Sequence, residues 1–394
     1  MKTRIRTGFF AFAICFFSFF PVSAQVRAVW VRPFVNANAE TRGSSVKGRE
    51  FIRLELEKIK RARLNTVYLE SFWSGYTIYP TRITKQRPLS ISYGVADENG
   101  QGWDVLQTYI EEGKKLNLKI HAWIHVFHQW NSNLGGLEKS PIFSRFPEWA
   151  MLDSAGSPLV KTEVEGINRD IYKTFLSPSN EEARRFLRLV VSELASNYPD
   201  LNGIQWDYIR YPLHSPETSF DYNPNTLAQF QRETKLDARK LSAKETPKEW
   251  KIWQDWKTRQ VSEFVKELAQ IIRDKQPEWE ISAAVFPSFE ENMRLKMQDS
   301  QAWAKLRLID ALLPMLYSTD FEKVDSWAKE FRAGIPAKTR IYPAIFIGHF
   351  YNAKEKSLDE RYLNLREKFK FNGFGLFAAQ SLTDDLIAKL AKEK

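Results

Sequence analysis

One acidic residue, Asp207, stands where a short apolar segment ends, and this position suits a catalytic carboxylate. The segment is Gly203–Pro212, with the sequence GIQWDYIRYP. Side chains alternate between the two faces of a β-strand, so Gly203, Gln205 and Asp207 are expected to share one face. Asp207 then lies at the carboxyl end of the strand, where barrel enzymes hold their catalytic groups. The alternative is a structural role, in which Asp207 caps the following loop or pairs with Arg210.

Cleavage of a glycosidic bond requires two carboxyl groups, one acting as an acid and the other as a base or nucleophile. The segment YLESFW places Glu70 near the carboxyl end of another predicted strand. We therefore expect Glu70 to be the partner of Asp207. Glu290, Glu291 and Asp320 also follow predicted strands, but they lie in loops whose direction a sequence does not fix.

A third segment, KIHAWIHVFHQW, carries alternating His121, Trp123 and His125 on one face. Residues four positions apart on a strand are separated by about 13 Å, too far for two of them to bind one metal ion. We therefore expect neither a metal site nor a cofactor. Packing inside the sheet and contact with a sugar are both compatible with this His–Trp pattern.

Further polar and aromatic side chains lie near the ends of predicted strands. Tyr317 ends the segment PMLYS, and Trp73 and Tyr76 follow Glu70 closely enough to form a stacking wall or to pack within a loop. Aromatic rings suit the flat faces of sugars. The expected substrate contacts are Arg32, Trp73, Tyr76, His121, Trp123, His125, Tyr208, Arg210, Tyr317 and Gln380.

The elements that would hold these residues alternate along the chain between short apolar runs and longer helical patterns. Parallel strands joined by helices are the expected result, and eight such units predict a single-domain (β/α)8 TIM barrel over residues 25–394. An open doubly wound sheet would usually carry a glycine-rich nucleotide fingerprint, and the sequence has none. The predicted strands are Val26–Phe34, Asn65–Phe72, Lys119–Phe127, Gly203–Tyr208, Glu280–Pro287, Ala311–Ser318, Ile341–Gly348 and Gly373–Ser381.

Long connections leave the carboxyl ends of three predicted strands, at about 73–102, 128–179 and 213–251. Connections that enter strands are short. In barrels the long loops at the carboxyl ends of the strands build the active site, so we expect these insertions to surround Asp207.

The first 24 residues have the pattern of a signal peptide, with Lys2, Arg4 and Arg6 before the apolar run Gly8–Phe20. Its removal would leave a chain with a charge of +7 and without cysteine, because Cys15 lies in this segment. No other apolar run is long enough to cross a membrane. We therefore expect an exported protein, periplasmic or extracellular, that does not bind nucleic acid.

Several segments together resemble the family 10 glycosyl-hydrolase-like proteins, a bacterial exported TIM-barrel family. They run in the expected order over nearly the whole mature chain. The resemblance implies a (β/α)8 barrel, a carbohydrate substrate in the cell wall, and Asp207 as the leading catalytic residue. Many relatives carry two consecutive acids where this chain has Asp207-Tyr208. The segments are VRAVWVRPF, NTVYLESFWSGYTIYPT, HAWIHVF, FLSPSNEEARRFL, GIQWDYIRYP, PMLYS and GFGLFAAQSL.

A weaker similarity links the chain to family 18 chitinases, through Gly203, Asp207, Met315 and Tyr317. The last acid of the chitinase strand motif falls on Ile209 here. The similarity implies a substrate with 2-acetamido groups, which Asp207 and Tyr317 would orient.

The leading hypothesis is an exported glycoside hydrolase that acts on an N-acetylated glycan, most plausibly the glycan strands of peptidoglycan. Its partner is then a polysaccharide or oligosaccharide. A carbohydrate-binding pseudoenzyme of the cell envelope is the alternative, since relatives have acids that this chain lacks. A wall-associated scaffold held by its positive charge is a third hypothesis, and salt would weaken its attachment.

Overall fold

The computed structural model describes residues 25–33, 45–86, 103–162, 171–213, 219–348 and 360–392. The predicted signal peptide, residues 1–24, lies outside the described residues, as does the second half of the 73–102 connection, residues 87–102. Within the described ranges, no helix combines the length and the apolar character that a membrane crossing requires.

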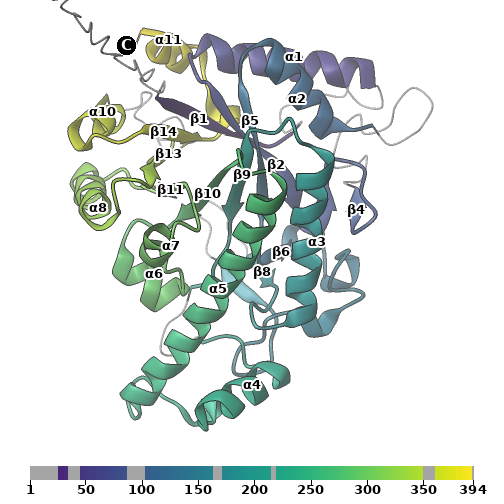
Figure 1. Ribbon diagram of the computed structural model, residues 1–394, viewed down its shortest axis with the longest axis vertical. Coiled ribbons are helices and arrows are strands. Elements are labelled where there is room, and N and C mark those ends of the chain that lie inside the picture. The colour runs from purple at the N-terminus through teal and green to yellow at the C-terminus, as the bar shows by residue number, and fades with distance from the viewer. Residues whose placement is uncertain are drawn as a thin grey trace, which may run out of the picture.

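Parallel strands form the centre of the molecule, and helices surround them (Figure 1). The ring closes through residues 340–346, because β12 pairs with β11 on one side and β13 pairs with β14 on the other. The prediction of a (β/α)8 barrel is therefore confirmed. In chain order the barrel strands are β1 (Val26–Val31), β2 (Thr66–Trp73), β5 (Lys119–His125), β9 (Gly203–Asp207), β10 (Glu280–Val285), β11 (Ala311–Pro314), β12 (Arg340–Ile341), β13 (Ala344–Phe346) and β14 (Gly373–Phe377).

The seventh barrel strand is divided, although the sequence predicts a single run over Ile341–Gly348. β12 ends at Ile341 and β13 begins at Ala344, with Tyr342 and Pro343 between them. Proline has no amide hydrogen to donate, which interrupts regular pairing. The carbonyl oxygen of Pro343 still accepts a hydrogen bond from the amide of Gly375 at 2.9 Å, so the ring stays closed at this point.

Helices cover the outside of the ring, and side chains cap several of them. Asn180 accepts a hydrogen bond from the amide of Ala183, and Thr383 accepts one from the amide of Leu386. The helices are α1 (Ser45–Arg61), α2 (Val105–Lys115), α3 (Glu181–Asn197), α4 (Pro224–Thr234), α5 (Pro247–Lys275), α6 (Phe289–Lys296), α7 (Ser300–Lys305), α8 (Phe321–Gly334), α10 (Glu360–Phe369) and α11 (Asp384–Lys392).

The long connections carry structure of their own. The first contains β3 (Tyr76–Thr77) and β4 (Lys85–Gln86), and the second contains a small sheet of β6 (His128–Asn131), β7 (Val160–Thr162) and β8 (Ile171–Phe175). The third contains α4, which lies with the first turns of α5 beyond the barrel, at the bottom of Figure 1. Helix α5 begins at Pro247, within the residues 213–251 of the predicted third connection.

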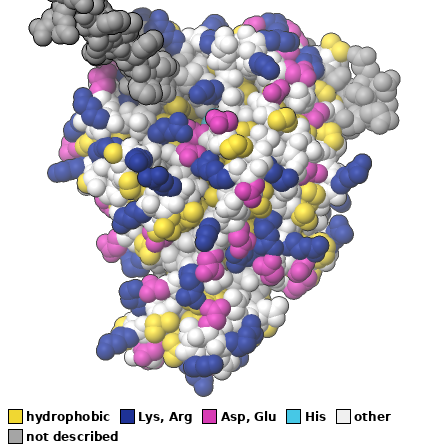
Figure 2. All heavy atoms as spheres, in the orientation of Figure 1, with side chains coloured by type: hydrophobic (Ala, Val, Ile, Leu, Met, Phe, Trp, Pro, Cys, Tyr) yellow, Lys and Arg dark blue, Asp and Glu magenta, His cyan; other side chains and the backbone are white. Residues whose placement is uncertain are grey.

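Charged side chains of both signs are interspersed on the face of the molecule shown in Figure 2. The net positive charge is therefore dispersed there rather than gathered into one basic surface.

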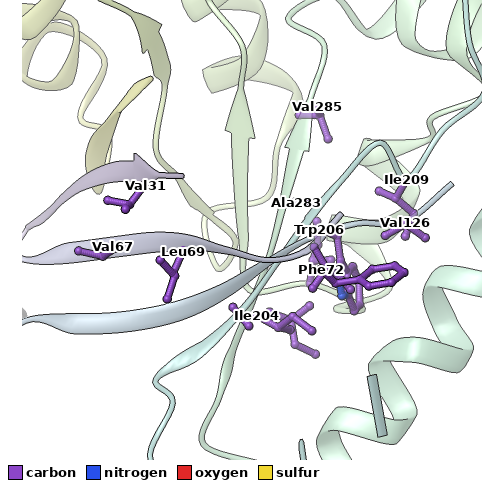
Figure 3. Close-up of a cluster of buried hydrophobic side chains, with 14 of the residues drawn as sticks. Val31, Val67, Leu69, Phe72, Val126, Ile204, Trp206, Ile209, Ala283 and Val285 are labelled. Carbon is purple, nitrogen blue, oxygen red and sulfur yellow. The ribbon is translucent and has the colours of Figure 1, made fainter. Parts of the chain in front are cut away.

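The barrel wall separates two groups of buried side chains. The outer group packs between strands and helices and includes Ile204 and Trp206 of β9, both fully buried (Figure 3). The inner group fills the barrel and includes Trp30, Tyr68 and Trp123. Consecutive residues of one strand therefore pack alternately in the outer group and in the inner group, as period-two alternation requires.

Replacing Ile204 with Ala tests the outer core. The change removes buried methyl and methylene groups between β9 and the helices, so we expect the free energy of unfolding to fall by about 2–5 kcal/mol. Chemical denaturation measures this change. Ile252→Ala, at a position on α5 that is 43% exposed, is the matched control and should stay within about 0.5 kcal/mol of the unmodified protein. Equal losses for both variants would contradict the described burial of β9.

Candidate functional site

Strand β9 directs Gly203, Gln205 and Asp207 into the barrel. A β-carbon added to Gly203 would lie 2.6 Å from Nδ1 of His121, whose ring packs against Tyr68 in the inner group. Asp207 is the last residue of the strand, and its Cα is paired with that of His125 on β5. The carboxylate therefore lies at the carboxyl end of the barrel, which we call the mouth.

The Asp207 carboxyl group is poorly hydrated and is surrounded by groups that favour its charged form. Burial raises its pKa above the ordinary value. The Arg210 charge, the Tyr208 amide and the Trp123 indole oppose this increase, and the amide donates to Oδ1 at 2.7 Å. Burial is the largest effect, so the protonated carboxyl persists to higher pH than an exposed aspartic acid.

Glu70 lies on the same side of the ring as Asp207, with one strand between them. It belongs to β2, is 4% exposed, and has its Oε1 3.8 Å from Nε2 of His125. His125 lies on β5, the strand between β2 and β9. Two strands separated by a third are about 10 Å apart, so His125 lies between the strands that carry the two carboxyl groups.

Aromatic rings line the part of the mouth next to Asp207. Phe377 at the end of β14 has its ring 6.0 Å from both the Trp123 and the Tyr317 rings. The guanidinium of Arg32 lies 5.4 Å from the centre of the Phe377 ring. Burial raises the pKa of the Tyr317 hydroxyl, and the charge of Asp207 raises it further. These contacts bring Arg32, Trp123 and Tyr317 together with Asp207.

Tyr208 turns the chain away from the barrel directly after Asp207. Its φ is 51°, in the left-handed region, and its ring lies 5.0 Å from that of His125 and 4.6 Å from that of His128. The hydroxyl accepts a hydrogen bond from Nζ of Lys173 at 3.3 Å, and Arg210 lies over the ring face at 4.7 Å. Tyr208 and Arg210 therefore form one wall of the mouth, together with the insertion strand β8.

A buried hydrogen-bond network fixes the segment that follows Arg210. Asp221 is fully buried and accepts hydrogen bonds from the Tyr211 hydroxyl at 2.6 Å and from Oγ of Ser177 at 2.5 Å. Burial raises the pKa of Asp221, while these donors favour the charged form. The network joins the chain after β9 to the chain after β8, which holds Arg210 and Lys173 in a fixed relation.

Trp73 and Tyr76 face each other across a hairpin that continues β2 beyond the barrel. The two residues are paired in the antiparallel ladder of β2 and β3, and Ser74 and Gly75 between them both have positive φ, as a tight hairpin turn requires. The Trp73 ring lies 6.4 Å from that of His125, which places it beside the mouth. Tyr76 is half-buried and packs against the outer core, which agrees with a role in packing.

Two predicted substrate contacts occupy other positions. His121 lies four residues before His125, and it lines a cavity of about 530 Å³ at the opposite end of the barrel with Lys119 and Glu280. Burial, aided by the charges of Lys119 and Arg340, lowers its pKa to about 3. His121 therefore does not belong to the site around Asp207.

Gln380 is the second of these residues. Strand β14 ends at Phe377, and Gln380 lies in the short 3₁₀ helix Ala379–Ser381 rather than at the end of the strand. The inward residue at this strand end is Phe377. Among the described residues, no three His, Cys, Asp or Glu side chains are grouped as the ligands of one metal ion.

Sequence reasoning missed Lys173, Lys296 and Phe286, which surround Tyr208 and Arg210. The ring of Phe286 lies 4.4 Å from Nζ of Lys296 and 4.9 Å from the Arg210 guanidinium. The inward position of Phe286 could have been predicted, because Ser282, Ala284 and Phe286 would share the inward face of the fifth predicted strand. The positions of Lys173 and Lys296 could not have been predicted, since they belong to an insertion strand and a short helix.

A solved glycosidase structure has a related fold. The catalytic domain of β-amylase from Paenibacillus polymyxa superposes with a TM-score of 0.57 over 92% of this chain and 94% of that domain, at 12% identity. At this identity the likeness concerns the fold alone.

Two curated relatives are similar in sequence. The glycosyl hydrolase DigH of Escherichia coli O6:H1 is 22% identical over 77% of this chain and 66% of its own length. The glycosyl hydrolase YngK of Bacillus subtilis is 24% identical over 68% of this chain and 46% of its own length, so this chain spans about half to two thirds of these relatives. The family model described as "Glycosyl hydrolase-like 10" matches residues 25–350, and the chain belongs to this family.

Proposed function

We propose that the protein is an exported glycoside hydrolase that cleaves an N-acetylated glycan, namely the glycan strands of peptidoglycan. Asp207 acts as the general acid that protonates the leaving oxygen. Glu70 is the second carboxyl group, which attacks the anomeric carbon or activates water. His125, between the two strands that carry them, positions Glu70 from a distance of 3.8 Å.

One observation carries the proposal: a partly buried Asp207 with a raised pKa at the mouth of a barrel of this family. A general acid must be protonated when substrate binds, and burial keeps Asp207 protonated to a higher pH than an exposed aspartic acid. The aromatic rings of Trp123, Tyr317 and Phe377 beside it offer flat surfaces for sugar rings. Relatives named glycosyl hydrolases support the reaction class.

The choice of substrate depends on two further features. Tyr317 lies close enough to Asp207 for the carboxylate charge to act on its hydroxyl, and a hydroxyl and a carboxyl together could orient a 2-acetamido group. The basic and apolar pattern of residues 1–20 supports export to a compartment that contains wall polymers.

Mass spectrometry of products from defined peptide-free glycan strands tests the reaction, and new reducing ends with N-acetylated sugars are the expected result.

Asp207→Asn tests the acid. We expect product release from glycan strands to fall by at least 10²-fold, which is the usual contribution of a general acid. The fold should be retained, because a raised pKa means that the unfolded chain releases this proton at lower pH than the folded protein. Ionisation of Asp207 therefore lowers the free energy of unfolding as the pH rises from the ordinary pKa of aspartic acid through the raised pKa. Asn does not ionise, so the variant does not lose this stability.

Product assays and thermal melts at pH 7 measure both effects, with the exposed Glu138→Gln as the matched control. We expect Asp207→Asn to have an unchanged or higher melting temperature. Undiminished turnover would remove Asp207 from the mechanism. Glycan binding with no cleavage by the unmodified protein would favour the carbohydrate-binding pseudoenzyme instead.

Arg210→Met tests the electrostatics of the acid. The Arg210 charge lowers the pKa of Asp207, so its removal should raise that pKa and move the alkaline limb of kcat/KM to higher pH. Arg210→Lys, which keeps a positive charge, should restore most of the original profile. Arg185→Met on exposed α3 surface should leave the limb in place. A limb that stays fixed or moves to lower pH in Arg210→Met contradicts the assignment of this limb to Asp207.

A further inference from the structure

Three cationic side chains from separate elements gather on one side of the mouth. Lys173 belongs to β8, Arg210 follows β9, and Lys296 ends α6. The Tyr208 ring lies between the first two, with Nζ of Lys173 at 5.2 Å and the Arg210 guanidinium at 4.7 Å from its centre. The Phe286 ring likewise joins Arg210 to Lys296.

Two of these cations are buried without a matching carboxylate. Arg210 is 9% exposed and Lys296 is 7% exposed. Within the described part of the chain, none of the three cations lies within ion-pair distance of an acidic side chain. Asp207 is the acid that acts on Arg210, and the exposed Glu291 acts on Lys296. A buried charge without a close partner is unfavourable, so burial disfavours the charged forms of Arg210 and Lys296.

We propose that Lys173, Arg210 and Lys296 form a subsite for a carboxylate carried by the glycan. This inference rests on the proposed function, because it assigns a substituent of the same substrate. The planar guanidinium of Arg210 matches a carboxylate in two parallel hydrogen bonds, and the two ammonium groups supply further donors. The rings of Tyr208 and Phe286 hold the three cations next to one another.

Two sources would supply this carboxylate. One is the lactyl ether of an N-acetylated wall sugar whose peptide has been removed, and the other is a uronic acid. Both present a singly charged carboxylate on a pyranose ring. Asp207 and Glu70 lie on the neighbouring side of the mouth, so a sugar held here would extend from the subsite toward the reacting groups.

The protonation of Lys296 should depend on this ligand. Burial, together with the charges of Arg210 on the β9–α4 loop and Lys173 on β8, lowers its pKa to about 6, while Glu291 on its own helix raises it. A bound carboxylate would favour the ammonium form. Binding should therefore weaken as the pH rises from 6 to 8, although the ligand stays ionised throughout this range.

Titrations with single sugars test the subsite without any bond being cleaved. The probes are N-acetylmuramic acid, its methylamide and glucuronic acid, added to the full chain and followed by NMR. We expect the acid form to bind roughly tenfold more tightly than the methylamide, and Lys296→Met to reduce this preference to about twofold or less and to remove its pH dependence. Lys173→Met should reduce the preference in the same direction.

Lys60→Met, at an exposed position near the end of α1, makes the same charge change elsewhere and should leave the preference intact. The melting temperature separates a binding role from a structural one. Removing an unpaired buried cation should leave it unchanged or raise it in Lys296→Met, whereas a structural role would lower it.

Equal affinity of the unmodified protein for the acid and the methylamide would overturn the subsite, as would an intact preference in Lys296→Met. Tighter binding of glucuronic acid than of N-acetylmuramic acid would support the subsite and contradict peptidoglycan as the substrate. Carboxylate preference with no cleavage of any glycan would support the subsite and refute the hydrolase. Cleavage of amidated strands at full rate would retain the hydrolase and refute a required carboxylate.

Discussion

The alternation of side chains along the barrel strands is the constraint on which the site depends. Because Ile204 and Trp206 must lie between the sheet and the helices, Gln205 and Asp207 must point into the barrel. A slip of one residue in β9 would place a carboxylate in the outer hydrophobic core and an indole at the mouth. The register of β9 against β5 then sets His125 beside Asp207. Packing of the apolar residues therefore determines where the reactive group stands.

The mouth has an unequal distribution of charge. Glu70 and Asp207, with His125 between their strands, supply the acidic side, while Lys173, Arg210 and Lys296 supply the basic side. Burial disfavours the charged form on both sides, since it raises the pKa of Asp207 and lowers that of Lys296. The Asp221 network fixes the loop between them although it does not reach the mouth itself. Such an arrangement is unfavourable for the empty protein and suits a polar ligand.

Most of the barrel could be predicted from local patterns, because each strand is short, apolar and followed by an amphipathic helix. Pro343 is the residue that divides the seventh strand, and its missing amide hydrogen could have been recognised in advance. Asp207 was predictable because strand end and inward face coincide at one residue. The predicted position of His121 beside Asp207 was wrong. His121 and His125 share one face of the strand, but four residues on a strand span about 13 Å, so His121 lies far from the mouth along the barrel axis.

The remaining differences between the predicted and the observed site concern residues outside the barrel strands. Lys296 belongs to FEENMRLK, a short helix with a mostly polar sequence that gives no sign of burial. Lys173 belongs to an insertion strand whose pairing with β6 no periodicity predicts. Both residues meet Arg210 only through tertiary packing, so their grouping cannot be read from spacing along the chain. Gln380 was assigned to a strand end that the chain reaches three residues earlier.

The central claim is that Asp207 is held in a poorly hydrated position at the mouth. A carbon-13 NMR titration of the aspartate side-chain carboxyl groups measures this directly, with the Asp207 signal identified by its loss in the Asn variant. The account predicts a pKa above about 3.9, the ordinary value for aspartic acid. A pKa at or below that value would contradict it, because the surrounding positive charges would then outweigh burial.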